Sequence, residues 1–335
     1  MARTIGLFEI LGCVFATAAG TFAAVEAEST KSRSLKELDR EVAFTVRGTP
    51  AATRTIADVE VLSDGRVAVL DFDTRRVAVF SGAGRFQTFL EPPRGISPES
   101  TLIPRLAARL DGGLVLVDNE GDRFLFYDNR LQPEAVVPFG VEIGGVNGFV
   151  RLSSGEMFVA GYSRAEDKIL HRFRAQGGYI ASYIGAVDLP FPERAAYNTG
   201  LIAVDPADET LWVTRLTPYE ILHVSQEGQM LGRISREPLG GFSPPVAEPV
   251  GDSLLRLRGD FSSSVKIAVV GDLVVNSYVL ENGKRLADVF QRDGTLVEAE
   301  LTQDSPLAFA KRVRDGVFVR HFNGQEPRVE VWKER

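Results

Sequence analysis

Six segments of this chain share one pattern, and this repetition constrains the fold more than any other feature of the sequence. Each segment opens with a tight turn, continues as an apolar run that ends at a polar corner, and resumes as a second apolar run. Asp-Gly or a similar pair opens four of the six segments, which is typical of a β-hairpin turn. The first apolar runs are residues 65–71, 112–118, 155–161, 209–215, 271–277 and 315–321.

The second apolar run repeats as regularly as the first. It occupies residues 77–80, 124–127, 170–173, 221–224, 287–290 and 329–332. In four copies a glycine follows it by four positions, and alternating strands such as 86–90 and 179–184 come next. Four strands per unit, with opening turns 43 to 62 residues apart, are the signature of propeller blades. The sequence therefore predicts an all-β, six-bladed β-propeller with four-stranded blades.

The last repeat is incomplete, which predicts how the ring closes. Its second apolar run ends at Trp332, and the three residues that follow cannot form another strand. Residues 41–46 alternate as a strand and precede the first repeat. We predict that this N-terminal strand completes the last blade and so leaves no open edge between the first and last blades. The propeller then spans residues 41–335, and residues 28–40 form a linker.

The repeat resembles that of the NHL family. An NHL unit contains a glycine turn, an apolar strand ending in Asp, a short corner with Arg, and an apolar strand that ends in an aromatic residue before a second glycine turn. Residues 64–84 follow this order closely, residues 111–127 follow it well, and the later copies depart from it at the Asp and in corner length. The resemblance covers about residues 41–335. It implies a propeller fold but no single function, because NHL-like propellers include scaffolds, ligand binders and a few enzymes.

The first 27 residues differ from the rest of the chain. Arg3 precedes a mostly apolar stretch that ends in small residues, which is typical of a secretory signal peptide. The expected location is therefore secreted or periplasmic, and the alternative is an uncleaved N-terminal membrane anchor. Cys13 is the only cysteine and lies within this stretch, so a cleaved chain has no disulfide and no thiolate chemistry.

The charge balance narrows the class of partner. The formal net charge is −7, whereas nucleic-acid binding requires a basic face. We therefore expect no nucleic acid and, after signal cleavage, no stable membrane insertion. The partner expected is a protein, peptide or glycan, bound by a monomer.

Paired charges recur at the corner between the second and third strands of a blade. Asp71 precedes Arg76 by five positions, and Asp118 precedes Arg123 by the same interval. In the fourth copy Arg215 and Glu220 repeat the spacing with the signs exchanged. This exchange predicts that the two positions form an ion pair that ties the corner together, rather than a catalytic carboxylate site.

The face formed by these corners and by the links between blades is the candidate ligand site. It carries aromatic, amide and arginine side chains, which suit a polar or anionic group. The candidate ligand-binding residues are Phe72, Arg75, Arg105, Asn147, Tyr162, Asn198, Tyr219 and His321. The long connection at residues 236–260 is a candidate lid or a tolerated insertion, and residues 254–257 suggest an extra strand.

Catalytic patterns are weak in this sequence. His171, His223 and His321 fall at positions that do not fit a zinc site built from several blades, and no Gly-x-Ser-x-Gly elbow or phosphate loop is present. Calcium is conceivable at Asp71, Asp118, Asn147 or Asn198.

The sequence predicts an exported binding scaffold without a cofactor. The alternative is a metal-dependent, lactonase-like hydrolase or lyase with its site at one end of the propeller channel. Whether the protein is an enzyme stays open at this point.

Overall fold

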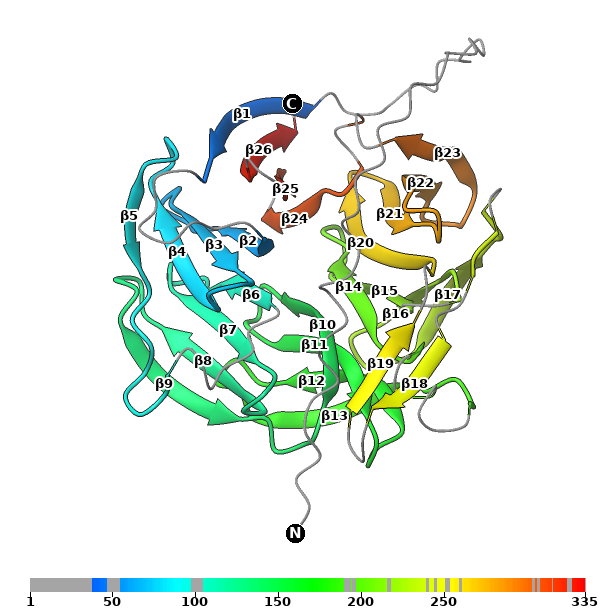
Figure 1. The fold of residues 1–335 in the computed structure, drawn as a ribbon, viewed down its shortest axis with the longest axis horizontal. Coiled ribbons are helices and arrows are strands. Elements are labelled where there is room, and N and C mark those ends of the chain that lie inside the picture. Colours follow the sequence, from blue (N-terminus) through cyan, green and yellow to red (C-terminus); the bar gives the residue numbers. More distant parts are fainter. Residues whose placement is uncertain are drawn as a thin grey trace.

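The computed structural model confirms the predicted fold: six four-stranded antiparallel sheets form a six-bladed β-propeller (Figure 1). It describes residues 38–46, 55–97, 105–189, 194, 197–215, 218–238, 241–243, 246–250, 254–258, 261–302, 305, 308–314, 316–323 and 327–334. The predicted signal peptide and most of the predicted linker lie outside these residues.

The blades follow one another along the chain, each running from the channel outward. Blade 1 contains β2 (Ile56–Val61), β3 (Val67–Asp71), β4 (Arg76–Phe80) and β5 (Phe86–Phe89). Blade 2 contains β6 (Arg105–Ala108), β7 (Leu114–Asp118), β8 (Arg123–Tyr127) and β9 (Pro133–Pro138). Blade 3 contains β10 (Gly144–Arg151), β11 (Met157–Ser163), β12 (Lys168–Phe173) and β13 (Tyr179–Gly185).

The second half of the ring has the same plan. Blade 4 contains β14 (Gly200–Val204), β15 (Leu211–Arg215), β16 (Glu220–Val224) and β17 (Met230–Ser235). Blade 5 contains β20 (Ser263–Val270), β21 (Leu273–Val279), β22 (Arg285–Gln291) and β23 (Leu296–Thr302). Blade 6 contains β24 (Lys311–Arg314), β25 (Val317–Phe322), β26 (Arg328–Glu334) and the N-terminal β1 (Leu38–Thr45).

The predicted closure of the ring is confirmed. Strand β1 pairs antiparallel with β26, so the two ends of the chain complete one blade (Figure 1). The strand begins at Leu38, earlier than the predicted start at residue 41. Phe44 of β1 packs on Phe80 of blade 1, with ring centroids 5.3 Å apart. Gly84 has a φ of 76°, and a Cβ there would lie 2.4 Å from the Phe44 side chain, so this repeated glycine allows both the turn and the closure.

The core is divided among the junctions between blades. Six large apolar clusters lie in the described residues, one at each junction between neighbouring blades. The junction of blades 2 and 3 is aromatic, because Phe124 contacts Phe139 at 4.7 Å and Phe173 at 5.0 Å between ring centroids. Packing of each blade on both neighbours holds a ring that has no disulfide.

The connection between blades 4 and 5 contains an additional hairpin. Strands β18 (Val246–Val250) and β19 (Leu254–Arg258) pair antiparallel and form a separate two-stranded sheet. The strand expected at residues 254–257 is therefore present. Among the residues described, no helix has the length and apolar character needed to cross a membrane.

Candidate functional site

Charged corners form ion pairs in two of the three predicted cases. Arg123 donates through Nε to Asp118 at 2.7 Å, and Arg215 donates through Nε to Glu220 at 2.6 Å. The prediction is wrong for Asp71 and Arg76. They are partners in the β3–β4 register, but the Asp71 carboxylate accepts the backbone N–H groups of residues 73 and 74, and Arg76 stacks on Phe89 at 4.0 Å. Local backbone donors at the turn have replaced the cross-strand cation.

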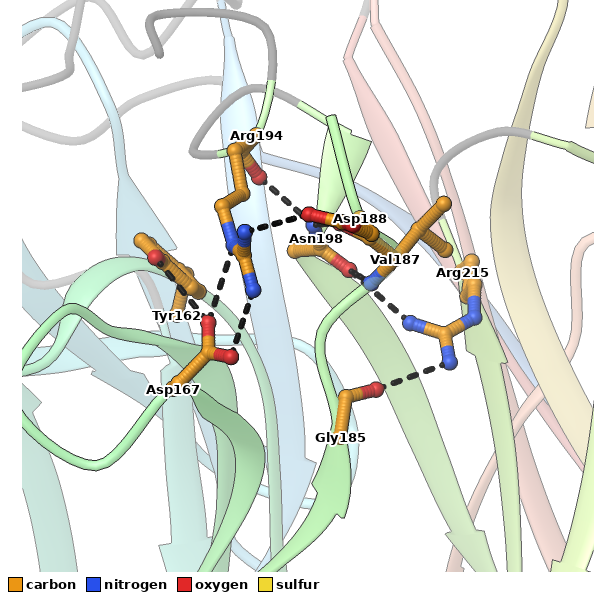
Figure 2. A network of polar contacts seen from close by, with 8 residues as sticks. All are labelled: Tyr162, Asp167, Gly185, Val187, Asp188, Arg194, Asn198 and Arg215. Atoms are coloured by element: carbon orange, nitrogen blue, oxygen red, sulfur yellow. Dashed lines mark hydrogen bonds and ion pairs between the residues drawn. The ribbon is translucent and has the colours of Figure 1, made fainter. Parts of the chain in front are cut away.

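A network of polar contacts fastens the link between blades 3 and 4, as Figure 2 shows. We call Asp167, Arg194, Asn198, Arg215 and Glu220 the link network. Arg194 donates to both carboxylate oxygens of Asp167, at 2.9 and 2.5 Å. The fully buried Asn198 side chain accepts from Arg215 at 2.9 Å and donates to the backbone oxygen of Arg194 at 2.7 Å. Each charge of the link network therefore has a counter-charge.

The link network accounts for two of the predicted ligand-binding residues. Asn198 lies at its centre, where its Oδ1 also accepts the N–H of Val187 at 2.6 Å. Tyr162 is buried beside it and donates its hydroxyl to Asp167 at 3.3 Å. Both side chains are engaged in holding the link, where the exposed Asp188 also accepts a hydrogen bond from Arg194 at 2.8 Å.

Three other predicted residues lie at two separate corners, in blades 1 and 4. Phe72 is half-buried in the corner of blade 1. Arg75 is exposed there and contacts Glu120 of the next blade at 3.4 Å. Tyr219 is buried and donates its hydroxyl to Asp288 at 2.7 Å, between blades 4 and 5. The structure therefore does not gather these three residues into one site.

The remaining predicted residues lie at the channel. Arg105 begins the inner strand β6 and donates through Nε to the backbone oxygen of Asn147 at 2.6 Å, on the inner strand β10. His321 ends near them, because Lys266, Asp58, Arg105 and Lys311 all act on its protonation. The ring thus brings Arg105 and Asn147 into contact, and Arg105 also acts on the protonation of His321.

Charged side chains from four inner strands meet at this level of the channel. We call Asp58, Glu60, Arg105, Lys266 and Lys311 the channel floor. Lys311 donates to both oxygens of Asp58, at 2.8 and 2.9 Å, and lies 3.5 Å from Glu60. The N–H of Leu106 also donates to Asp58, at 3.1 Å. Asp58 and Glu60 are both nearly inaccessible to solvent.

Burial and neighbouring charges change the protonation of the channel floor. Burial would raise the pKa of Asp58, but the surrounding cations outweigh it and lower that pKa to about 2. Burial dominates at Glu60, and despite Lys311 it raises the pKa to about 8. Burial lowers the pKa of Lys266 to about 7; Asp58 opposes this decrease, and Arg105 and Lys311 add to it. Burial lowers the pKa of His321 to about 3, and the positive charge of Lys266 is the next largest cause of this decrease. This histidine is therefore neutral.

A cavity of about 560 Å³ rises from the channel floor. Its walls include the apolar side chains of Ala107, Phe149, Ile202 and Val313. It extends to the turns between first and second strands, where Arg109, Ser153 and Glu209 line it. Those turns lie on the face opposite the corners and links, because successive strands are antiparallel. The cavity therefore extends away from the predicted ligand face, whose role in binding stays a prediction.

The histidines and acids do not gather as metal ligands. Within the described part of the chain, no three His, Cys, Asp or Glu side chains form a group that could hold a metal ion. His171 bonds to Ser182 and to the Gly161 oxygen, and His223 stacks on Trp212 with ring centroids 4.1 Å apart. Of the conceivable calcium ligands, Asp118 and Asn198 are engaged by protein donors, and Asp71 is engaged through one of its two carboxylate oxygens. The channel floor does not fit calcium either, since its acids face three cations.

Sequence reasoning missed Asp58, Glu60, Lys266 and Lys311, which form most of the channel floor. The signal that could have found them is a charged residue within an otherwise apolar inner strand. Asp58 and Arg105 also precede the turn glycines of their repeats by the same distance, which places them at equivalent levels of the channel. Glu60, Lys266 and Lys311 each precede the turn glycine of their repeats by five positions, so repeat alignment groups these three residues as well.

Comparisons with known proteins support the fold and leave the family open. No family model matches the chain, and no curated protein is similar to it. Solved structures are similar in fold. A Bacteroides fragilis protein described as exported has a TM-score of 0.59 at 10% identity and covers 88% of this chain and 94% of its own. An inactive virginiamycin B lyase from Staphylococcus aureus with quinupristin has a TM-score of 0.52 at 12% identity, covering 85% and 82%. BBS1N in complex with ARL6DN has a TM-score of 0.51 at 12% identity, covering 84% of this chain and 78% of its own. At these identities the likeness shows the six-bladed β-propeller fold alone.

Proposed function

We propose that the protein is an exported, NHL-like binding propeller that holds a protein or peptide partner on the face formed by its corners and links. The observation that carries this proposal is the link network, which holds that face in one arrangement by paired charges. A prearranged surface loses less conformational entropy on binding, which favours recognition. Charged side chains of both signs lie at least partly exposed there, including Arg75 and Glu120, which pair with each other, and Asp188, which pairs with Arg194.

Similar propellers support a partner-binding role. BBS1N is a propeller of similar fold that has been solved with a protein partner. The net charge of −7 favours a protein or peptide over a nucleic acid. We further propose that the protein acts as a monomer, outside the cytoplasm and without a cofactor. A glycan partner is the alternative outcome of the experiment below.

A metal-dependent hydrolase or lyase is not favoured by the geometry of the channel. Such an enzyme needs oxygen or nitrogen ligands that converge on a cation. Here Lys311 already holds Asp58 and lies near Glu60, and Arg105 and Lys266 add positive charge. A divalent cation would be repelled unless these side chains moved.

The experiment compares face variants with a variant on the opposite face. Purified protein is screened against a peptide display library and a glycan array, and the dissociation constant of each hit is measured. Arg75→Glu and Asp188→Lys are expected to weaken binding at least tenfold, whereas Arg130→Glu, at an exposed turn of the opposite face, leaves it unchanged. Binding that is insensitive to the face variants, or turnover of lactones and esters without any bound partner, would contradict the proposal.

A further inference from the structure

One lysine of the channel floor reaches the cavity from an inner strand. Lys266 lies in β20, and its half-buried side chain lines the cavity. The cavity volume of about 560 Å³ lies within the range of sites for small organic molecules. Phe149, Ile202 and Val313 make its walls apolar, so a molecule with an apolar body gains hydrophobic burial beside this lysine.

The amino group of Lys266 is attracted by an acid but is not bonded to one. Asp58 attracts it, but Lys311 donates to both oxygens of that carboxylate, at 2.8 and 2.9 Å. The N–H of Leu106 donates to the same carboxylate at 3.1 Å. Among the residues that the structure describes, none accepts a hydrogen bond from Lys266 or forms an ion pair with it. Its amino group can therefore meet a molecule in the cavity without breaking a hydrogen bond within the protein.

The surroundings of Lys266 favour the neutral amine. Burial lowers its pKa to about 7, against the attraction of Asp58 and with the help of Arg105 and Lys311. About half of these side chains are therefore neutral at pH 7, whereas an ordinary lysine with a pKa of about 10.4 is almost entirely protonated. A neutral amine is a nucleophile, and lysines that form Schiff bases are activated by desolvation or by a neighbouring cation. Lys266 has both features.

We propose that Lys266 binds an aldehyde or ketone with an apolar body in this cavity, as a reversible Schiff base. The lone pair of Nζ forms a bond to the carbonyl carbon, and one amine hydrogen moves to the carbonyl oxygen. That oxygen then leaves as water with the second amine hydrogen. A C=N bond has replaced the C=O bond, and no further reactant is needed. Phe149 and Ile202 contact the body of the ligand.

Reductive labelling with hexanal and cyanoborohydride at pH 7 tests the proposal, because cyanoborohydride converts a Schiff base into a stable secondary amine. Peptide mass mapping then gives the labelling rate of each lysine. Lys266 is expected to react at least tenfold faster than Lys284, an exposed lysine of the same blade. Lys266→Met should remove the fast label, whereas Lys284→Met leaves it unchanged. The comparison of the two lysines within the native protein holds even where a variant does not fold.

The pH dependence distinguishes Lys266 from an ordinary lysine. Only the neutral amine reacts, so the rate at Lys266 should level off above about pH 8, whereas the rate at Lys284 continues to rise to about pH 10. The ratio of the two rates should therefore fall about tenfold for each pH unit between 8 and 10. The charged or titratable groups around Lys266 in the channel are Asp58 and Glu60 on β2, Arg105 on β6, Lys311 and Arg312 on β24, and His321 on β25.

A comparison of two aldehydes tests the role of the apolar walls. The ratio of labelling at Lys266 to labelling at Lys284 should be at least tenfold larger for hexanal than for formaldehyde, which has no apolar body. Equal ratios for the two aldehydes, a ratio near one for hexanal at pH 7, or a ratio that does not change with pH would overturn the proposal. A fast label that persists in Lys266→Met would also overturn it. None of these results depends on the partner proposed for the opposite face.

Discussion

The link network and the channel floor are both clusters of charged side chains, but their charges are balanced differently. In the link network, Arg194 is paired with Asp167 and Arg215 with Glu220, and hydrogen bonds use the remaining polar atoms of Asn198. In the channel floor, Lys311 holds Asp58 through two hydrogen bonds, whereas burial raises the pKa of Glu60 to about 8 although Lys311 lies 3.5 Å away. Balanced charge holds a structure in place, whereas a buried acid whose pKa is raised makes the stability of the fold depend on pH.

The largest predicted effect breaks the link network. Arg215→Met removes the main counter-charge of the buried Glu220 and a donor to Asn198, so we expect a loss of about 3–5 kcal/mol in the free energy of unfolding. Urea unfolding followed by circular dichroism measures it. Arg233→Met removes the exposed second partner of Glu220 and should cost less than about 1 kcal/mol. Equal costs for the two variants would mean that the network does not stabilise the fold.

Glu60 of the channel floor is expected to make the folded state less stable as the pH rises, whereas an acid in a stabilising ion pair makes it more stable. The pKa of Glu60 is raised to about 8, so the folded state keeps a proton that the unfolded state releases above its ordinary pKa of 4.5. Stability therefore falls as the pH rises from about 4.5 to 8. Glu60→Gln should remove this slope and raise stability at pH 8 by about 2–4 kcal/mol, since one pKa unit corresponds to about 1.4 kcal/mol. An equally steep slope in the variant would assign the effect to other groups.

The ion pair between Asp58 and Lys311 in the channel floor can be tested by acid unfolding. Its pKa is lowered to about 2 from an ordinary value of 3.8, so the folded state is favoured above pH 3.8 and loses that advantage as the pH falls to 2. The contribution at neutral pH is about 2 kcal/mol. Lys311→Met removes the closest cation and should move acid unfolding, followed by circular dichroism, upward by about one pH unit. An unchanged acid midpoint would show that Lys311 does not hold Asp58 ionised.

The difference between the two clusters also explains what the sequence could predict. Strands such as 67–71 and 76–80, and the corners between them, follow from residues close together in the chain. The closing strand β1 followed from an incomplete last repeat, and its pairing with β26 bears this out. The channel floor depends on closure of the whole ring. Lys311 reaches Asp58 across 253 positions and Leu106 across 205, and no local pattern encodes these contacts.

The corners show a further limit of prediction from sequence, because two pairs with the same spacing make different contacts. Asp71 and Arg76 have the same register relation as Asp118 and Arg123, yet only the second pair bonds. At the first corner the backbone N–H groups of residues 73 and 74 approach the same carboxylate oxygen, and Phe89 offers its ring to the arginine. The choice between competing local partners depends on side-chain orientation, which spacing does not specify.

The smallest predicted effect measures this difference between the corners. A double-mutant cycle with Asp118→Asn and Arg123→Met should give a coupling energy of about 1 kcal/mol, because the Asp118 carboxylate is buried and Arg123 is only partly exposed. The matching cycle with Asp71→Asn and Arg76→Met should give a coupling energy near zero. Urea unfolding of the native protein and the six variants measures both coupling energies. Equal coupling at the two corners would mean that Asp71 and Arg76 attract each other without a direct contact, and the balance of charge at a corner would then matter more than its hydrogen bonds.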